Sequence, residues 1–173
     1  MAARSNKERA VEYPKRKQNR LQKFDYSLPN AYFVTICAEQ KKSLFWTHTP
    51  AAIECPKDVP LSAYGNAVYR GICAIPVRYP MISVDNYAIM PNHIHLLLQI
   101  HSDVDGRPMP APTISTVVNQ MKGAVSKEIG HSVWQKGFHD HVIRGEEDYR
   151  EIWQYIEGNP GKWMEDTLCR EKG

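Results

Sequence analysis

No hydrophobic run in the 173-residue sequence approaches the roughly 18 apolar residues that a membrane-spanning helix needs. The segment 1–10 is polar and charged, so the sequence predicts no secretory signal there. The chain has only 4 cysteines and no C-x-x-C pair, a usage typical of a reducing compartment. These absences predict a soluble, cytoplasmic protein with no membrane partner.

The motifs of several common enzyme classes are also missing. The sequence has no G-x-x-x-x-G-K-[ST] loop and no dinucleotide-binding glycine pattern, so nothing in it indicates nucleotide-driven chemistry. It has no nucleophile-elbow pattern around a serine or cysteine, so nothing indicates a hydrolase triad. Any catalytic chemistry is therefore expected from other residue types.

The chain has an ordinary globular composition with an uneven distribution of charge. Apolar residues make up 42% and charged residues 24% of 173 residues, which is enough for one domain with its own core. Residues 1–23 contain eight basic and two acidic residues, so this segment carries +6 and the other 150 residues carry −3 of the chain's net +3. A basic arm on a mildly acidic body favours binding to a phosphate backbone, although a solubilising terminus would have the same charge.

Hydrophobic periodicity predicts the element order strand, helix, strand, strand, helix, strand, helix. We expect strands at 32–37, 84–90, 93–100 and 133–144, and helices at 61–75, 114–129 and 146–159. Pro76 is expected to stop the first helix and Pro160 the last, and Pro91-Asn92 predicts a tight hairpin. The first six elements match the ferredoxin-like split βαβ arrangement. We therefore predict an α+β domain with an antiparallel sheet and helices on one face, leaving the other face for a site and the last helix.

His93 and His95 lie two positions apart in a predicted strand, where side chains alternate between the two faces. The two histidines therefore share the face opposite the apolar residues of that strand, Ile94, Leu96, Leu98 and Ile100. Two imidazoles on one rigid strand can ligate one metal ion. Surface histidines, or histidines with hydrogen-bond partners in the core, would give the same pattern.

A second H-x-H pair, His139 and His141, also falls in a predicted strand. Its imidazoles could ligate a metal ion, make structural hydrogen bonds or contact phosphate groups. The spacing alone leaves these roles open.

Tyr155 lies in the last predicted helix, roughly 110° from the centre of the apolar stripe at about 100° per residue. That stripe consists of Tyr149, Ile152, Trp153 and Ile156. Tyr155 is therefore not an obvious core residue, although a tyrosine at the edge of a stripe is common. Asn159 follows one turn later and is the expected last residue of the helix, so a hydroxyl nucleophile and an amide ligand could point to one spot.

Five ordered motifs resemble the HUH-type single-tyrosine transposases, and most of all the REP-associated tyrosine transposases. The motifs are Arg-Leu…Asp-Tyr-Ser at 20–27, Tyr-Phe-Val-Thr at 32–35, Met-Pro-Asn-His-Ile-His-Leu-Leu at 90–97, Trp-Gln…Phe-His-Asp-His-Val-Ile-Arg at 134–144 and Tyr-Ile-Glu-Gly-Asn-Pro at 155–160. The resemblance spans about residues 16 to 163, nearly the whole chain. The resemblance divides the chain into a basic arm (1–23), an HUH transposase-like catalytic domain (24–163) and a short tail (164–173).

The resemblance also implies a mechanism. His93 and His95 would hold a divalent ion, Mg²⁺ or Mn²⁺, with Asn159 as the third polar ligand. Tyr155 would attack a phosphodiester of single-stranded DNA, giving a 5′-phosphotyrosine link and a free 3′-OH. The enzyme would then cleave and rejoin DNA beside hairpin or repeat elements.

Basic side chains are candidates for contacts to the DNA backbone, and these are Arg16, Lys17, Arg20, Lys122, Lys127, Lys136, Arg144 and Lys162. The resemblance also allows a homodimer and implies a cytoplasmic, nucleoid-associated location. Two other classes share part of the pattern. A metal-dependent phosphoesterase that uses water would need the histidines but not Tyr155, and a non-catalytic ferredoxin-like nucleic-acid-binding module would need neither.

Overall fold

A computed structural model describes residues 29–50, 57–101 and 112–165 of the chain. Four strands form one antiparallel sheet in the order β2-β3-β1-β4. The strands are β1 (Asn30–Cys37), β2 (Ile82–Ile89), β3 (His93–Ile100) and β4 (His139–Val142). The helices are α1 (Ala63–Arg78), α2 (Ile114–Ile129) and α3 (Glu146–Gly158), with two 3₁₀ turns, η1 (Glu39–Lys41) and η2 (Pro160–Glu165).

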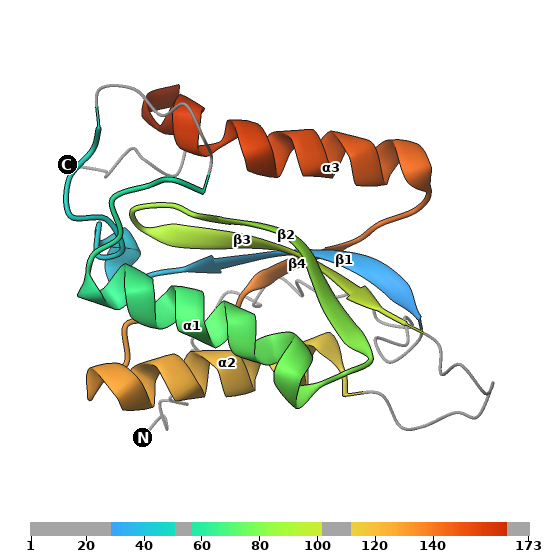
Figure 1. Ribbon diagram of the computed structural model, residues 1–173, viewed down its shortest axis with the longest axis horizontal. Coiled ribbons are helices and arrows are strands. Elements are labelled where there is room, and N and C mark those ends of the chain that lie inside the picture. Colours follow the sequence, from blue (N-terminus) through green and yellow to red (C-terminus); the bar gives the residue numbers. More distant parts are fainter. Residues whose placement is uncertain (1–28, 51–56, 102–111, 166–173) are drawn as a thin grey trace, which may run out of the picture.

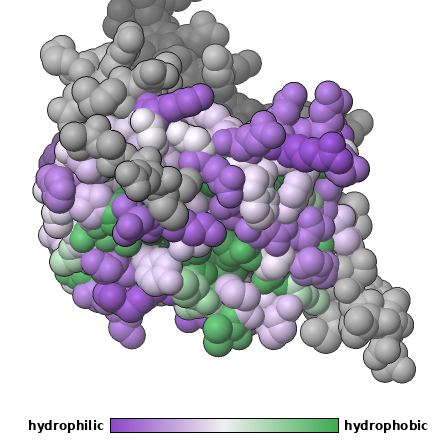
Figure 2. Space-filling model, turned by 45° about the horizontal axis from the view of Figure 1, so that its top comes forward, coloured by the Kyte–Doolittle hydropathy of each residue, from purple (hydrophilic) through white to green (hydrophobic). Residues whose placement is uncertain are grey.

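The helices lie in two layers, with α1 and α2 on one face of the sheet and α3 on the other (Figure 1). The strand order and the element order are those of the ferredoxin-like split βαβ arrangement. The predicted α+β fold is therefore confirmed, including the place of the last helix. The first turn of α3 is acidic (Glu146, Glu147 and Asp148), which suits the positive end of a helix dipole. Figure 2 shows hydrophilic surface over that end of the molecule.

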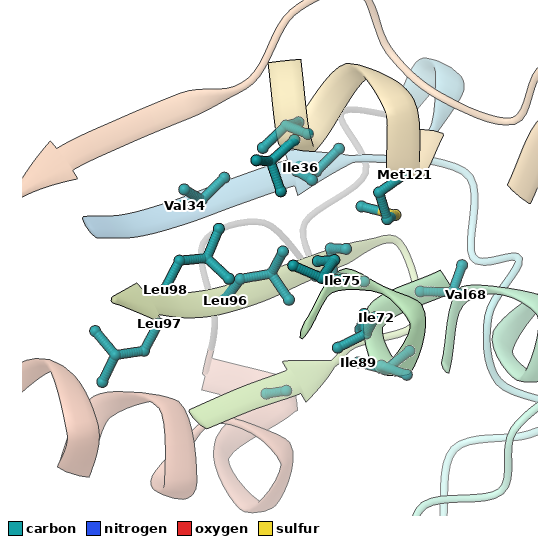
Figure 3. Packing of buried hydrophobic residues seen from close by; sticks show 14 of the residues in the cluster. Val34, Ile36, Val68, Ile72, Ile75, Ile89, Leu96, Leu97, Leu98 and Met121 are labelled. Carbon is teal, nitrogen blue, oxygen red and sulfur yellow. The ribbon is translucent and has the colours of Figure 1, made fainter. Parts of the chain in front are cut away.

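Strand β3 is covered on both faces, because it lies inside the sheet and between the two helical layers. Leu96 and Leu98 point toward the core formed with α1 and α2, whereas Leu97 points toward α3 (Figure 3). All three leucines are buried, as are His93 and His95 on the α3 face. The alternation read from the sequence is correct, and the face that carries the histidines is an interior face.

The end of α1 differs from the prediction. Pro76 lies inside the helix, which continues to Arg78. The proline removes one main-chain donor, but the N–H of Tyr79 still donates to the carbonyl of Ile75 at 2.9 Å, so the last turn closes. A proline in the final turn therefore does not end this helix.

Two glycines allow α1 to pack closely. A Cβ at Gly65 would lie 2.1 Å from the carbonyl oxygen of Phe45, and a Cβ at Gly71 would lie 2.6 Å from Val125 of α2. These glycines lower helix propensity, but they bring α1 against its neighbours.

The predicted strand at 133–144 was too long. The structure has a single bridge between Ala38 and Trp134, a left-handed Gly137 with φ of 82°, and then the short strand β4. Lys122 binds the carbonyl oxygens of Gln135 and Gly137, both at 2.9 Å, and so takes these acceptors out of any sheet pairing. By contrast, α2 has the predicted bounds and ends at a left-handed Gly130.

The basic arm at 1–23 and the motif at 20–27 lie outside the described residues. No helix in the described part of the chain is long and apolar enough to cross a membrane.

Candidate active site

The two histidines of β3 lie against each other on the face of the sheet that α3 covers. The Nε2 atoms of His93 and His95 are 3.0 Å apart, and the side chains are 0% and 2% exposed. The strand's alternation puts both rings on one face, and the closeness of the strand to α3 and η2 buries them.

The other nitrogen of each imidazole is held by a neighbouring polar side chain. Nδ1 of His93 lies 2.8 Å from Oδ1 of Asn92, and Nδ1 of His95 lies 2.9 Å from Oγ1 of Thr35 on β1. The amide oxygen of Asn92 only accepts, so His93 donates from Nδ1 and its Nε2 carries a lone pair. The Thr35 hydroxyl can donate or accept, so His95 can present Nε2 either as a donor to His93 or as a second lone pair.

This arrangement fits a divalent cation. Two neighbouring ligands of an octahedral ion, each about 2.1 Å from the metal, are about 3.0 Å from each other. The Nε2 atoms have that separation, and the orienting hydrogen bonds at Nδ1 are typical of metal-binding histidines. No cluster of three or more His, Cys, Asp or Glu side chains able to hold a metal occurs within residues 29–50, 57–101 and 112–165. The resemblance implies an amide, that of Asn159, as the third protein ligand.

Asn159 is positioned to be that amide. It caps the C-terminus of α3, is buried, and its Nδ2 has no hydrogen-bond partner among the described residues. Because Nδ2 is a donor, only a hydrogen-bond acceptor would satisfy it, and a cation on the amide oxygen would not. Asn159 is thus buried at the end of the helix that carries Tyr155, and its role as a ligand stays a prediction.

The pKa of His93 is lowered from 6.5 to about 3. Burial is the larger cause, because it disfavours the charged imidazolium, and the positive charge of Lys41 adds to the effect. The imidazole is therefore neutral at physiological pH, which is the form that ligates metal ions.

Tyr155 lies beside the histidine pair and is half-exposed. Its ring centroid is 5.3 Å from that of His95 and 5.9 Å from that of Phe33, and the residue is 48% exposed. Phe33 in turn stacks on His95 at 5.2 Å, so one aromatic ring supports both groups. The expectation that Tyr155 is not a core residue is confirmed.

The other tyrosine of α3 is in a different environment. The Tyr149 hydroxyl donates to Oδ2 of Asp85 at 2.9 Å, and burial together with this carboxylate raises its pKa to about 12. Asp85 lies at a register shift in β2, between Val84 and Asn86. Tyr149 therefore fastens α3 to the sheet and is a poor nucleophile.

The second H-x-H pair is near the site but not part of it. His139 and His141 are exposed on β4, and the register places β1 between them and β3. Nε2 of His141 lies 2.9 Å from Oδ2 of Asp148, which also accepts from the main-chain N–H of Arg144. The hydrogen bond from the main-chain N–H of Arg144 is the main cause that lowers the pKa of Asp148, and the hydrogen bond with His141 and the charge of Arg144 add to it. This pair thus has a structural hydrogen bond at the start of α3.

The predicted DNA-contacting residues are distributed over several parts of the surface. Lys136, Arg144 and Lys162 are exposed, and Lys127 is exposed on α2, on the sheet face away from Tyr155. The Lys122 ammonium is already bound to two carbonyl oxygens, so its prediction as a backbone contact is not supported. Arg16, Lys17 and Arg20 lie outside the described residues.

Sequence reasoning missed several residues of the site. Asn92 and Thr35 orient the histidines, and Phe33 supports His95 and Tyr155. Trp163 of η2 is buried, with its ring 6.0 Å from that of His93 and 6.1 Å from that of Trp46. Three of these residues, Phe33, Thr35 and Asn92, belong to the motifs at 32–35 and 90–97. Thr35 and Asn92 are polar residues within apolar runs, and this was the signal that the sequence offered.

Comparison with solved structures defines the class of fold. A REP-associated tyrosine transposase bound to a REP hairpin superposes with a TM-score of 0.60 and 19% identity, over 83% of this chain and 74% of that chain. The chain therefore has the fold of this tyrosine transposase, as the motifs predicted. A candidate transposase from Deinococcus radiodurans superposes less well, with a TM-score of 0.46 and 15% identity over 79% of this chain and 94% of that chain.

Comparison of sequences defines the family. The chain is 31% identical over 173 aligned positions to an uncharacterized protein of Haemophilus influenzae, and the match covers 88% of this chain and 92% of the relative. The chain belongs to the same protein family as this relative. No model of a known family matches the sequence.

Proposed function

We propose that this protein is an HUH-type single-tyrosine transposase, which cleaves and rejoins single-stranded DNA beside hairpin or repeat elements. One observation carries the proposal. The half-exposed Tyr155 lies next to a buried pair of histidines whose Nε2 atoms are 3.0 Å apart. The fold shared with a transposase that was solved on a REP hairpin supports the same function.

The reaction is a transesterification in which Tyr155 is the nucleophile. Its phenolic oxygen attacks the phosphorus of a DNA phosphodiester and loses its proton to solvent, and the bond from phosphorus to the 3′ oxygen breaks. The 3′ oxygen takes up a proton, so the products are a 5′-phosphotyrosine and a free 3′-OH. One phosphoester bond replaces another, so attack by a 3′-OH on the phosphotyrosine rejoins strands.

His93, His95 and Asn159 would hold the divalent ion. Bound there, Mg²⁺ or Mn²⁺ would offset the charge of the phosphate and of the leaving 3′ oxygen. Imidazole ligands suit Mn²⁺ better than Mg²⁺. Asn92 and Thr35 would keep the Nε2 lone pairs directed at one point, and Trp163 would limit the access of water to His93.

The substrate is expected to be unpaired at the scissile phosphate, since a rigid duplex cannot bend its backbone against one face of α3. Exposed basic residues beyond the two ends of α3, Arg144 and Lys162, would contact the DNA backbone, together with the basic arm at 1–23. A single chain supplies both the histidine pair and Tyr155, so the proposed site needs no second subunit. A homodimer and a nucleoid-associated, cytoplasmic location remain predictions.

Replacement of Tyr155 by phenylalanine tests the proposal. Tyr155→Phe removes only the hydroxyl, so Mn²⁺ and hairpin DNA should still bind, whereas covalent adduct, cleavage and rejoining should all fall by on the order of 10⁴-fold. The assay is a labelled hairpin oligonucleotide incubated with Mn²⁺ or Mg²⁺ and resolved under denaturing conditions. Tyr149→Phe, on the same helix, is the matched control and should still form the adduct.

Two outcomes would contradict the proposal. Cleavage that persists in Tyr155→Phe, with no adduct in the parent protein, would assign the site to a water-using phosphoesterase. If the protein binds the hairpin DNA but neither the parent nor any variant cleaves it with any metal, the protein would be a non-catalytic nucleic-acid-binding module.

A further inference from the structure

Helix α3 covers mainly one half of the sheet face that carries the histidines. It packs against β2 and β3 (Figure 1). On the same face, the outer strand β4 presents His139 and His141, and both side chains are exposed. β1 lies between the two halves, because it pairs with β3 on one side and with β4 on the other. A strip of sheet surface over β1 and β4, called here the β1–β4 strip, therefore borders the helix that carries Tyr155.

Phe33 stands where the covered half of this face meets the β1–β4 strip. Its cross-strand neighbour on β3 is the buried Leu97, and its neighbour on β4 is the exposed His141. Side chains of directly paired residues lie on the same face of a sheet, so the Phe33 ring shares the face of α3 with both. The residue is half-buried, and its main chain is paired on both sides, so the exposed part belongs to the ring.

The Phe33 ring also contacts the nucleophile and one histidine of the site. It stacks on His95 with the centroids 5.2 Å apart and the planes at 27°, and it meets the Tyr155 ring edge-on, with the centroids 5.9 Å apart and the planes at 90°. These two contacts leave part of the ring exposed. An accessible aromatic surface therefore lies one ring contact away from the proposed nucleophile.

We propose that Phe33 stacks on the base of a nucleotide that adjoins the scissile phosphate. This inference rests on the proposed function and adds a base-binding residue to it. Every nucleobase has a flat π-face, so stacking on an aromatic side chain binds an unpaired base of any sequence. The base of such a nucleotide is one sugar away from the phosphorus that Tyr155 attacks, which agrees with the direct contact between the rings of Tyr155 and Phe33.

The rest of the β1–β4 strip suits the same ligand. The exposed histidines of β4 provide imidazole groups, which can form hydrogen bonds with base edges and with phosphate oxygens. A base inside a duplex is stacked on its neighbours and could place a face on Phe33 only by flipping out. The strip would therefore favour a strand that is unpaired at the point of cleavage.

The proposal predicts an energetic coupling between Phe33 and one base. Phe33→Leu removes one stacking partner, and an abasic site on one side of the scissile phosphate removes the other. Either change alone should slow adduct formation by about 10- to 100-fold, which is the effect of one stacked base. Because both changes remove the same contact, Phe33→Leu should have little further effect on the abasic strand. Phe33→Tyr keeps the ring and should retain most of the parent rate.

Tyr87→Leu is the matched control. Tyr87 is a half-buried aromatic residue of β2, and its ring lies 6.2 Å from that of Tyr69 on α1, on the other face of the sheet. Loss of this ring should change adduct formation on intact and abasic strands by the same factor, because Tyr87 cannot reach the base.

The measurements are single-turnover adduct formation on hairpin oligonucleotides, intact or abasic on either side of the scissile phosphate, and Mn²⁺ titration calorimetry of each full-length variant. If Phe33→Leu slows the intact strand and both abasic strands by the same factor, or slows none of them, the inference is wrong and the proposed function stands. Equal slowing together with weaker Mn²⁺ binding would show that Phe33 only supports His95. If the parent forms no adduct, the proposed function fails, and this inference fails with it.

Discussion

At the residue scale, the site depends on hydrogen bonds that fix each imidazole by its second nitrogen. His93 is held by its sequence neighbour, whereas His95 is held by Thr35 from another strand. Period-two alternation was enough to place both histidines on one face. It could not supply Thr35, because the pairing of Thr35 with His95 follows from strand register. Burial of that face depends on α3, which the local sequence of β3 does not specify.

Removing the hydroxyl of Thr35 should weaken metal binding without harming the fold. Thr35→Val keeps the shape of the side chain but leaves Nδ1 of His95 without its partner, and loss of such an orienting bond costs about tenfold or more in metal affinity. Mn²⁺ titration of the variant measures this loss. Thr47 makes a comparable bond at the surface, 3.0 Å from Nδ1 of His48, so Thr47→Val is the control. Equal Mn²⁺ affinity in the two variants would contradict an orienting role.

At the element scale, local signals predicted most of the secondary structure. Pro91-Asn92 marked the hairpin, and Gly130 marked the end of α2. The errors have tertiary causes. α1 passes Pro76 because its last turn still closes, and β4 is short because Lys122 captures two carbonyl oxygens that a longer strand would have used. Periodicity carries no information about either contact.

Two helical glycines, Gly65 in α1 and Gly123 in α2, test whether close packing of a helix against its neighbours requires glycine. Gly65→Ala places a Cβ against the Phe45 carbonyl, a backbone atom that cannot easily move, and should destabilise the protein by about 2–3 kcal/mol. Gly123→Ala, where a Cβ would meet nothing within 4 Å, should instead stabilise it by about 0.5–1 kcal/mol through helix propensity. Urea unfolding of both variants gives the two free energies. Stabilisation by Gly65→Ala would refute the close contact.

At the scale of the whole molecule, neutral buried His93 makes stability depend on pH. The unfolded chain binds a proton at this residue near pH 6.5, whereas the metal-free folded protein does so only near pH 3. The contribution of neutral His93 to the free energy of unfolding is therefore fully present above pH 6.5. It is lost as the pH falls toward 3, by up to about 1.4 kcal/mol for each pH unit.

We expect urea unfolding midpoints of the metal-free protein to decrease across that pH range. His93→Gln removes the titrating group and should flatten the decrease, whereas His131→Gln, at an exposed position, should leave it unchanged. A decrease of the same steepness in His93→Gln would show that other groups cause the acid sensitivity.

The two sides of the site belong to different layers of the molecule. The histidines are built into a strand with a neighbour on each side, and Tyr155 is carried by a single helix that lies across the sheet. Tyr149 to Asp85 and His141 to Asp148 fasten that helix, and Ile156 anchors it in the core. Under the proposed function, the nucleophile and the metal ligands are therefore assembled only while α3 is docked. The fraction of time that α3 spends docked sets an upper limit on turnover, and local opening of this one helix would abolish activity while the sheet and its other helical layer stay folded.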